Sequence, residues 1–171
     1  MASNVNDLEA LRTATMERIR ARFVKDGEFG MSEAMLFRLD GAMEMLALDL
    51  DFQDQRLEIQ RRCAEHKVWL VHHIQEVWMV ETDTTDPAAV AEVEAAAREK
   101  SLDRHPRRTE RVLFTEESMS TSVRMWGADI ERDSAGRASL GPFQEASLKL
   151  PWPGFKRYLP ATGKPGSGAT A

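Results

Sequence analysis

The sequence predicts a mainly α-helical protein of two or three helices, with one long central helix over about residues 33–81 and a C-terminal third that is largely extended or irregular with minor β-structure. Two observations lead to this prediction. The first proline of the chain is Pro87, and apolar residues recur every seven positions through 33–81. Six of the seven prolines follow residue 104, so regular helix is expected to end there.

The charge distribution divides the chain in the same place. Residues 1–103 contain 12 Lys and Arg against 21 Asp and Glu, whereas residues 104–171 contain 11 against 7. We therefore expect a helical region over 1–103, followed over 104–171 by a basic, Pro/Gly-rich extended arm. The arm carries at most a short hairpin and is not an independent domain.

The first helix is expected over about residues 7–25. Asn6 and Glu9 have the spacing of a capping box, and apolar residues then recur at three-to-four spacing up to Gly27. A later helix is expected over 88–100, because Asp86 can cap it and Pro87 suits its first turn.

The long central helix is expected from a seven-residue repeat. An unbroken helix of this length would span roughly 74 Å, whereas a compact globule of this chain length is about 40 Å across. Either the helix breaks, near Gly41 or within Asp49–Asp54, or the protein is elongated. The first positions of the repeat are all apolar: Leu36, Met43, Leu50, Leu57, Ala64, Val71 and Trp78.

Residues 68–80 are apolar almost all round a helix, but too few to span a bilayer. Trp69 and Trp78 lie nine positions apart and therefore on different sides of that helix. One tryptophan can meet the chain's own helices, and the other needs a partner chain. The isolated chain is therefore expected to oligomerise or aggregate.

The C-terminal arm is expected to hold short strand-like pieces, with Asp133–Gly136 as the turn of a possible hairpin. Three prolines within 151–160 favour an extended, unpaired stretch whose aromatic side chains point outward as anchors for a partner. The candidate partner-binding residues are Trp69, Trp78, Trp126, Trp152, Phe155 and Tyr158.

A basic cluster stands where the arm begins. The cluster lacks the interleaved aromatic residues of a nucleic-acid platform and belongs to an acidic chain, so nucleic acid is not expected as a partner. Lipid headgroups are a possible one. The cluster consists of Arg104, Arg107, Arg108 and Arg111.

One stretch offers an enzymatic alternative. Residues 45–53 resemble the first motif of haloacid-dehalogenase-type phosphatases, in which a strand ends in two aspartates separated by one residue. The resemblance implies a magnesium-dependent phosphohydrolase that uses Asp49 and Asp51. The seven-residue repeat runs through both aspartates, however, and favours an acidic helix face. A strand at 45–50 would favour the phosphatase instead.

Other catalytic and metal-binding patterns are missing from the sequence. His72 and Glu76 could share a helix face, but a di-metal bundle needs a Glu-x-x-His pair on each of two helices. The sequence also lacks the phosphate-loop, dinucleotide, zinc-protease and Cys-x-x-Cys motifs. We therefore predict a non-enzymatic protein with no catalytic, cofactor-binding or metal-binding residues.

The expected function is that of an accessory, or supernumerary, structural subunit of a large multiprotein assembly. The long helix would serve as a strut and residues 142–171 as a clasp on other subunits. An organellar membrane complex, such as the mitochondrial respiratory chain or ATP synthase, is the leading context, and a virion or tail component is the alternative. The single cysteine fits an intracellular, reducing compartment, and the mitochondrion is the expected one.

Overall fold

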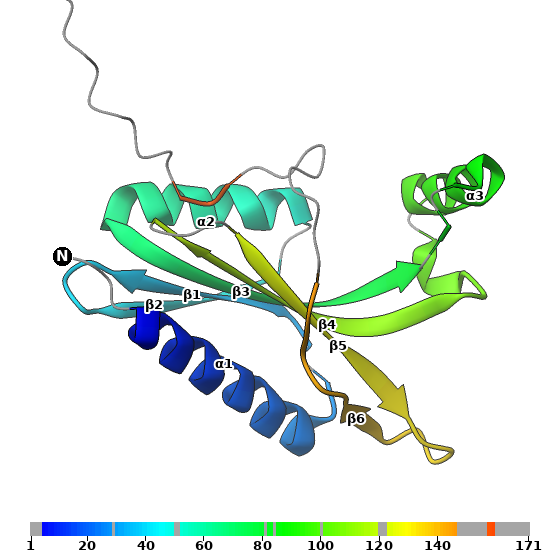
Figure 1. Cartoon of the computed structure of the whole chain (residues 1–171), viewed down its shortest axis with the longest axis horizontal. Helices are drawn as coiled ribbons and strands as arrows, with labels where there is room; N and C mark the ends of the chain where they lie inside the picture. Colours follow the sequence, from blue (N-terminus) through cyan, green and yellow to red (C-terminus); the bar gives the residue numbers. More distant parts are fainter. Residues whose placement is uncertain are drawn as a thin grey trace, which may run out of the picture.

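The described residues form a mixed α/β structure, so the mainly α-helical prediction is wrong. The computed structural model describes residues 5–28, 30–49, 52–80, 82–83, 85–99, 101–119, 123–146 and 157–159. Three helices accompany a seven-stranded antiparallel sheet that curls into a half-barrel (Figure 1). The elements in chain order are α1 (Val5–Asp26), β1 (Ser32–Arg38), β2 (Met43–Leu48), α2 (Phe52–His66), β3 (Val68–Val80), α3 (Pro87–Arg98), a 3-10 turn η1 (Leu102–Arg104), β4 (Arg108–Ser118), β5 (Arg124–Arg132), β6 (Ala138–Leu140) and β7 (Gln144–Glu145).

The predicted long helix over 33–81 is instead two strands, a helix and a third strand. Gly41 and Lys67 both adopt positive φ, which ends regular structure between β1 and β2 and between α2 and β3. The apolar run 68–80 is the central strand β3, which is buried on both faces from Leu70 to Gln75 and partly exposed beyond, and it is not a buried helix. Neither the unbroken helix nor the elongated shape derived from it applies.

The sheet has the strand order β2-β1-β3-β4-β5-β6, and β7 pairs with β5. All pairs are antiparallel, and β3 with β4 form the longest, in register from Leu70 opposite Ser118 to Val80 opposite Arg108. This pairing joins residues on the two sides of the boundary expected near residue 104. It also replaces the minor β-structure predicted for the C-terminal third with two long strands, β4 and β5.

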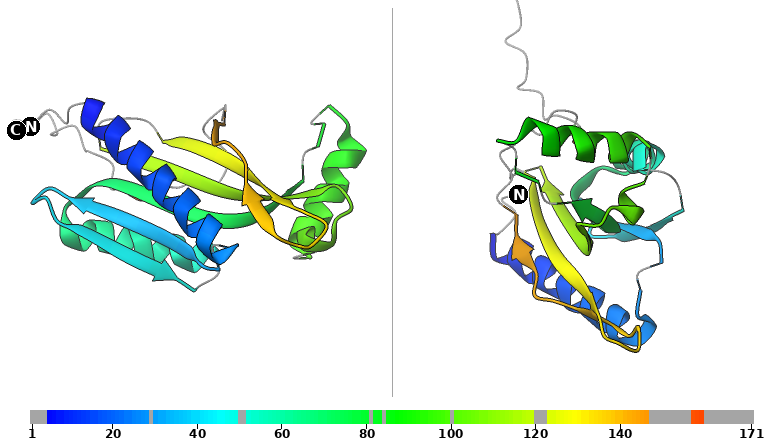
Figure 2. Two further views of the ribbon diagram at one scale, coloured as in Figure 1. Left: turned by 90° about the horizontal axis from the view of Figure 1, so that it is seen from below. Right: turned by 90° about the vertical axis from the view of Figure 1, so that its right-hand side faces the viewer.

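The two larger helices lie on opposite faces of the sheet, as Figure 2 shows from two further directions. Residues of β3 alternate between these faces, so Ile74 packs under α1 and Val71 packs under α2. The α1 core contains Ile19, Phe23, Met35, Ile74, Val112, Phe114, Trp126 and Ile130. The α2 core contains Ala34, Leu36, Leu48, Ile59, Cys63, Val68, Val71, Tyr158 and Leu159.

Several local predictions are confirmed. Helix α1 covers the expected range, and Asp86 caps α3 by accepting hydrogen bonds from two backbone N–H groups, with Pro87 in the first turn. The expected turn over Asp133–Gly136 joins β5 to β6, and the Gly136 N–H donates to the Asp133 carbonyl. No helix within the described ranges is both long and apolar enough to cross a membrane.

Candidate ligand-binding hollow

Of the six predicted partner-binding residues the structure describes four, which do not form one cluster, although Trp78 and Tyr158 border the same hollow. Trp126 and Tyr158 are buried within the chain, at 6% and 5% exposure, so the expectation that Tyr158 points outward is wrong. Trp78 is 40% exposed near the end of β3, and Trp69 is partly buried near its start. Trp152 and Phe155 lie outside the described residues. Binding of a partner by this set stays a prediction.

The arginines of the predicted basic cluster lie along η1 and the start of β4, and each contacts an acidic or aromatic side chain. Their interaction with lipid headgroups stays a prediction. Arg104 lies near Asp103, Arg107 pairs with Glu92, Arg108 lies over the Trp78 ring and Arg111 pairs with Asp129.

The phosphatase alternative has the strand that it requires, since β2 ends at Leu48, immediately before Asp49. The predicted helix across these aspartates is therefore wrong. Asp49 is exposed, β2 is an edge strand of an antiparallel sheet, and Asp51 lies outside the described residues. Within the described ranges, no group of three or more His, Cys, Asp and Glu side chains could hold a metal ion. The enzymatic alternative stays untested.

A hollow of about 490 Å³ lies on the α2 face of the sheet, where alternate residues of β3, β4 and β5 form its floor. The strand register arranges this floor in rows that cross the strands. Gln75, Leu113 and Gly127 form the middle row, since Leu113 lies opposite both other residues. Met125 lies beside this row on β5 and Val77 on β3. The middle of the hollow is therefore largely apolar.

Gly127 contributes to the depth of the hollow because it has no side chain on the floor. A Cβ atom placed there would lie 3.6 Å from Cδ2 of Leu113 and 3.9 Å from Cδ of Arg111, which are ordinary contact distances. A larger side chain would extend into the hollow without first meeting backbone. Glycine inside a strand often marks a site where a ligand or another backbone segment approaches closely.

Tyr158 closes the inner end of the hollow and is fixed by two interactions. Its hydroxyl is hydrogen-bonded to Nδ1 of His73 at 2.8 Å, and its backbone N–H donates to Glu117 at 2.7 Å. Burial lowers the pKa of His73 to about 4, so its ring is neutral and can accept this hydrogen bond. Burial also raises the pKa of Tyr158 above its ordinary value, which keeps the phenol protonated.

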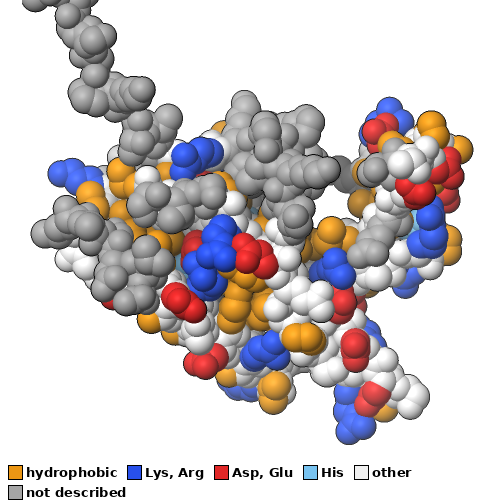
Figure 3. Space-filling view, viewed as in Figure 1, with side chains coloured by type: hydrophobic (Ala, Val, Ile, Leu, Met, Phe, Trp, Pro, Cys, Tyr) orange, Lys and Arg blue, Asp and Glu red, His pale blue; other side chains and the backbone are white. Residues whose placement is uncertain are grey.

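The outer end of the hollow carries charged side chains that are paired. Arg111 on β4 lies directly opposite Asp129 on β5, and the two form an ion pair. Glu145 on β7 lies opposite Trp126, so its side chain points to the α1 face, where it accepts two hydrogen bonds from Arg124, at 2.8 and 2.7 Å. In the space-filling view of Figure 3, basic and acidic side chains lie beside each other in the middle of the molecule, next to a hydrophobic patch.

The comparisons with known proteins add no relative. No protein-family model, no curated protein and no solved structure matches the chain. The fold and the hollow therefore have to be interpreted from their own geometry.

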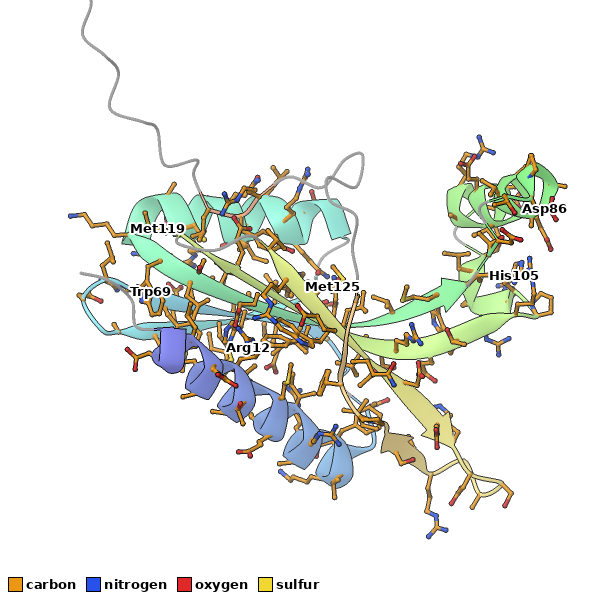
Figure 4. All side chains as sticks on the ribbon, in the orientation of Figure 1. Arg12, Trp69, Asp86, His105, Met119 and Met125 are labelled. Carbon is orange, nitrogen blue, oxygen red and sulfur yellow. The ribbon has the colours of Figure 1, made fainter. Side chains whose placement is uncertain are left out.

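A buried polar network lies on the opposite face, under α1. Arg12 reaches from α1 to the middle of the sheet (Figure 4) and donates two hydrogen bonds to Glu116, at 3.2 and 2.7 Å. Glu116 also lies 3.2 Å from Nε2 of His72, whose Nδ1 lies 2.9 Å from the Thr15 hydroxyl. Burial alone would raise the pKa of Glu116, but the hydrogen bonds from His72 and Arg12 outweigh it and lower that pKa.

The protonation of this network follows from its partners. Burial lowers the pKa of His72, so the ring is neutral. Ionised Glu116 can only accept, so Nε2 of His72 carries the proton and Nδ1 accepts from the Thr15 hydroxyl. A chain of hydroxyl, imidazole and carboxylate resembles a catalytic triad in its order, but Thr15 and His72 are 2% and 0% exposed. The network joins α1 to the sheet.

Sequence reasoning missed both the hollow and this network, because it placed His72 on a helix and gave β4 only a short strand. One signal was present: apolar and polar residues alternate through Ala128–Glu131, which is typical of a strand with two different faces. Gly127, between Trp126 and Ala128, was a second signal.

Proposed function

We propose that the protein binds a small, largely apolar molecule in the hollow on the α2 face. The observation that carries the proposal is a concave surface of about 490 Å³ with Val77, Leu113 and Met125 on its floor. Small-molecule sites in proteins are concave and mostly apolar, with a few polar groups that orient the ligand. Gln75 and Thr115 supply such groups beside the apolar floor.

The test is a fluorescence titration of the full chain with N-phenyl-1-naphthylamine, an uncharged apolar probe whose emission increases in an apolar site. We expect saturable binding by the wild type. Gly127→Val should weaken it at least tenfold, because valine fills the hollow and suits a strand.

The matched control is Ser139→Val, an exposed position on β6 outside the hollow, which should bind the probe as the wild type does. Circular dichroism verifies that both variants are folded. The absence of saturable binding by the wild type would refute the proposal. Equal binding by Gly127→Val would show that the probe binds elsewhere.

The second candidate function is the expected role as an accessory subunit, in which another chain binds at the edge of the sheet. Strand β2 is an edge strand, and near it Leu39, Met43 and Met45 are 60%, 51% and 52% exposed. Exposed edge strands readily pair with further extended segments. The organellar and virion contexts stay predictions.

Light scattering after size-exclusion chromatography tests this candidate over a range of protein concentrations. If the β2 edge is an interaction surface, the wild type should associate with itself at high concentration, and Met45→Lys should stay monomeric because lysine blocks edge pairing. A wild-type chain that is monomeric at every concentration would count against this candidate.

A further inference from the structure

The charges around the hollow determine which molecules it can accept. Two charged side chains line it, Arg111 and Asp129, and they pair with each other. Glu145 also borders the hollow, but it lies opposite Trp126, and its carboxylate pairs with Arg124 on the α1 face. Each charge at the wall of the hollow thus has a partner of opposite sign. The hollow therefore offers a ligand no excess charge to neutralise.

A charged ligand would meet two costs in this site. A carboxylate loses hydration when it enters an apolar hollow, and it regains that free energy only by pairing with a cation and accepting hydrogen bonds. Among the described lining residues Arg111 is the one cation, and Asp129 is already beside it. An entering carboxylate would therefore lie close to a second carboxylate, which is unfavourable.

The inner part of the floor offers uncharged hydrogen-bonding groups instead. The amide of Gln75 and the hydroxyl of Thr115 belong to neighbouring strands, on the same face, in adjacent rows of the register. They are 7% and 2% exposed and border the apolar surface of Leu113 and Met125. Together an amide and a hydroxyl can both donate to and accept from one neutral polar group.

We propose that the ligand is an uncharged molecule with an apolar body and one hydrogen-bonding group, and that Asp129 excludes carboxylates from the hollow by occupying Arg111. This inference rests on the proposed function. The apolar body lies over Leu113 and Gly127, and the polar group faces Gln75 and Thr115. Asp129 is thus a specificity-determining residue.

The experiment compares two probes of equal chain length, 1-octanol and octanoate, by their displacement of N-phenyl-1-naphthylamine from the full chain. The wild type should bind octanol at least tenfold more tightly than octanoate. Asp129→Asn removes the negative charge beside Arg111, so an entering carboxylate no longer meets a second carboxylate there. Octanoate affinity should then rise at least tenfold, and added salt should reduce this gain, while octanol affinity stays within threefold of wild type.

The matched control is Glu131→Gln, which removes one exposed negative charge from the same strand without touching the ion pair. It should leave both affinities within threefold of wild type. If wild type binds octanoate as tightly as octanol, or if Asp129→Asn gains no octanoate affinity, the inference is wrong while the proposed function stands. If neither octanol nor N-phenyl-1-naphthylamine binds, the proposed function itself fails.

Discussion

Glu116 and Glu117 are consecutive residues of β4, yet their carboxylates hold different elements on opposite faces of the sheet. Glu116 accepts hydrogen bonds from Arg12 of α1, and Glu117 accepts them from the backbone N–H groups of Tyr158 and Leu159. Both glutamates are at most 1% exposed. Because neighbouring side chains of a strand point to opposite faces, one dipeptide fixes α1 beneath the sheet and residues 157–159 above it.

Removal of the Glu116 carboxylate should destabilise the fold strongly. Glu116→Ala leaves the Arg12 guanidinium and Nε2 of His72 without their acceptor, and loss of one member of a buried ion pair costs about 3–5 kcal/mol. Urea unfolding at pH 7 measures the change. Glu131→Ala, at an exposed position, is the control and should change the free energy of unfolding by less than about 0.5 kcal/mol. Equal costs for the two variants would refute a structural role for the network.

Glu117→Gln should expose Tyr158. The glutamine amide presents an NH₂ group where the carboxylate accepted from a backbone N–H, so residues 157–159 lose part of their attachment. Tyr158 is the one tyrosine of the chain, so nitration by tetranitromethane reports on it alone. We expect at least tenfold faster nitration than in wild type. A rate equal to that of wild type and of Glu131→Gln would contradict the anchoring role.

His73 should make stability depend on pH below neutrality. Its folded-state pKa of about 4 lies below the unfolded value near 6.5, so unfolding takes up a proton between these values. The contribution is fully present above pH 6.5 and is lost as the pH falls toward 4. Between pH 7 and pH 5 the loss amounts to about 2 kcal/mol.

His73→Gln tests this pH dependence, because glutamine can still accept from the Tyr158 hydroxyl but does not titrate. Between pH 7 and pH 5, the free energy of unfolding of this variant should fall by about 2 kcal/mol less than that of wild type. His66→Gln, at a partly exposed position on α2, is the control. Parallel pH profiles for wild type and His73→Gln would rule out this origin.

The thiol of Cys63 should be unreactive in the folded protein. The side chain is 2% exposed, and burial raises the pKa of the thiol to about 12. We expect Ellman's reagent to modify Cys63 at least a hundredfold more slowly in native buffer than in 6 M guanidinium chloride. Rapid modification of the native chain would show that α2 does not pack Cys63 against the sheet.

Parts of the fold that depend on local signals could be predicted from the sequence. The cap at Asp86 and the turn at Asp133–Gly136 involve residues only a few positions apart, so their chemistry is visible in the chain itself. Strand β3 could not be recognised in this way. A central strand with both faces covered loses the alternation that identifies strands, and its apolar run fits a buried helix equally well.

The candidate site depends on contacts between distant residues and was not predicted. The aromatic residue Tyr158 stood out in the sequence, but its position is determined by Glu117, 41 residues earlier. The hollow needs the register of three strands, which brings Gln75, Leu113 and Gly127 into one row. No short-range pattern encodes such a row, although Gly127 within a strand hinted at it.

Helix α3 has no buried residue and stands apart from the body of the molecule at the end of the β3–β4 pair (Figure 1). The strands on either side of it are already joined in register, with Val80 opposite Arg108. The two ends of the segment between these residues are therefore held together by the pairing of β3 with β4, and not by packing of α3. Its backbone amides can exchange with solvent by local opening, without unfolding of the sheet. A reporter domain inserted in the segment between Val80 and Arg108 would leave the hollow and both cores in place.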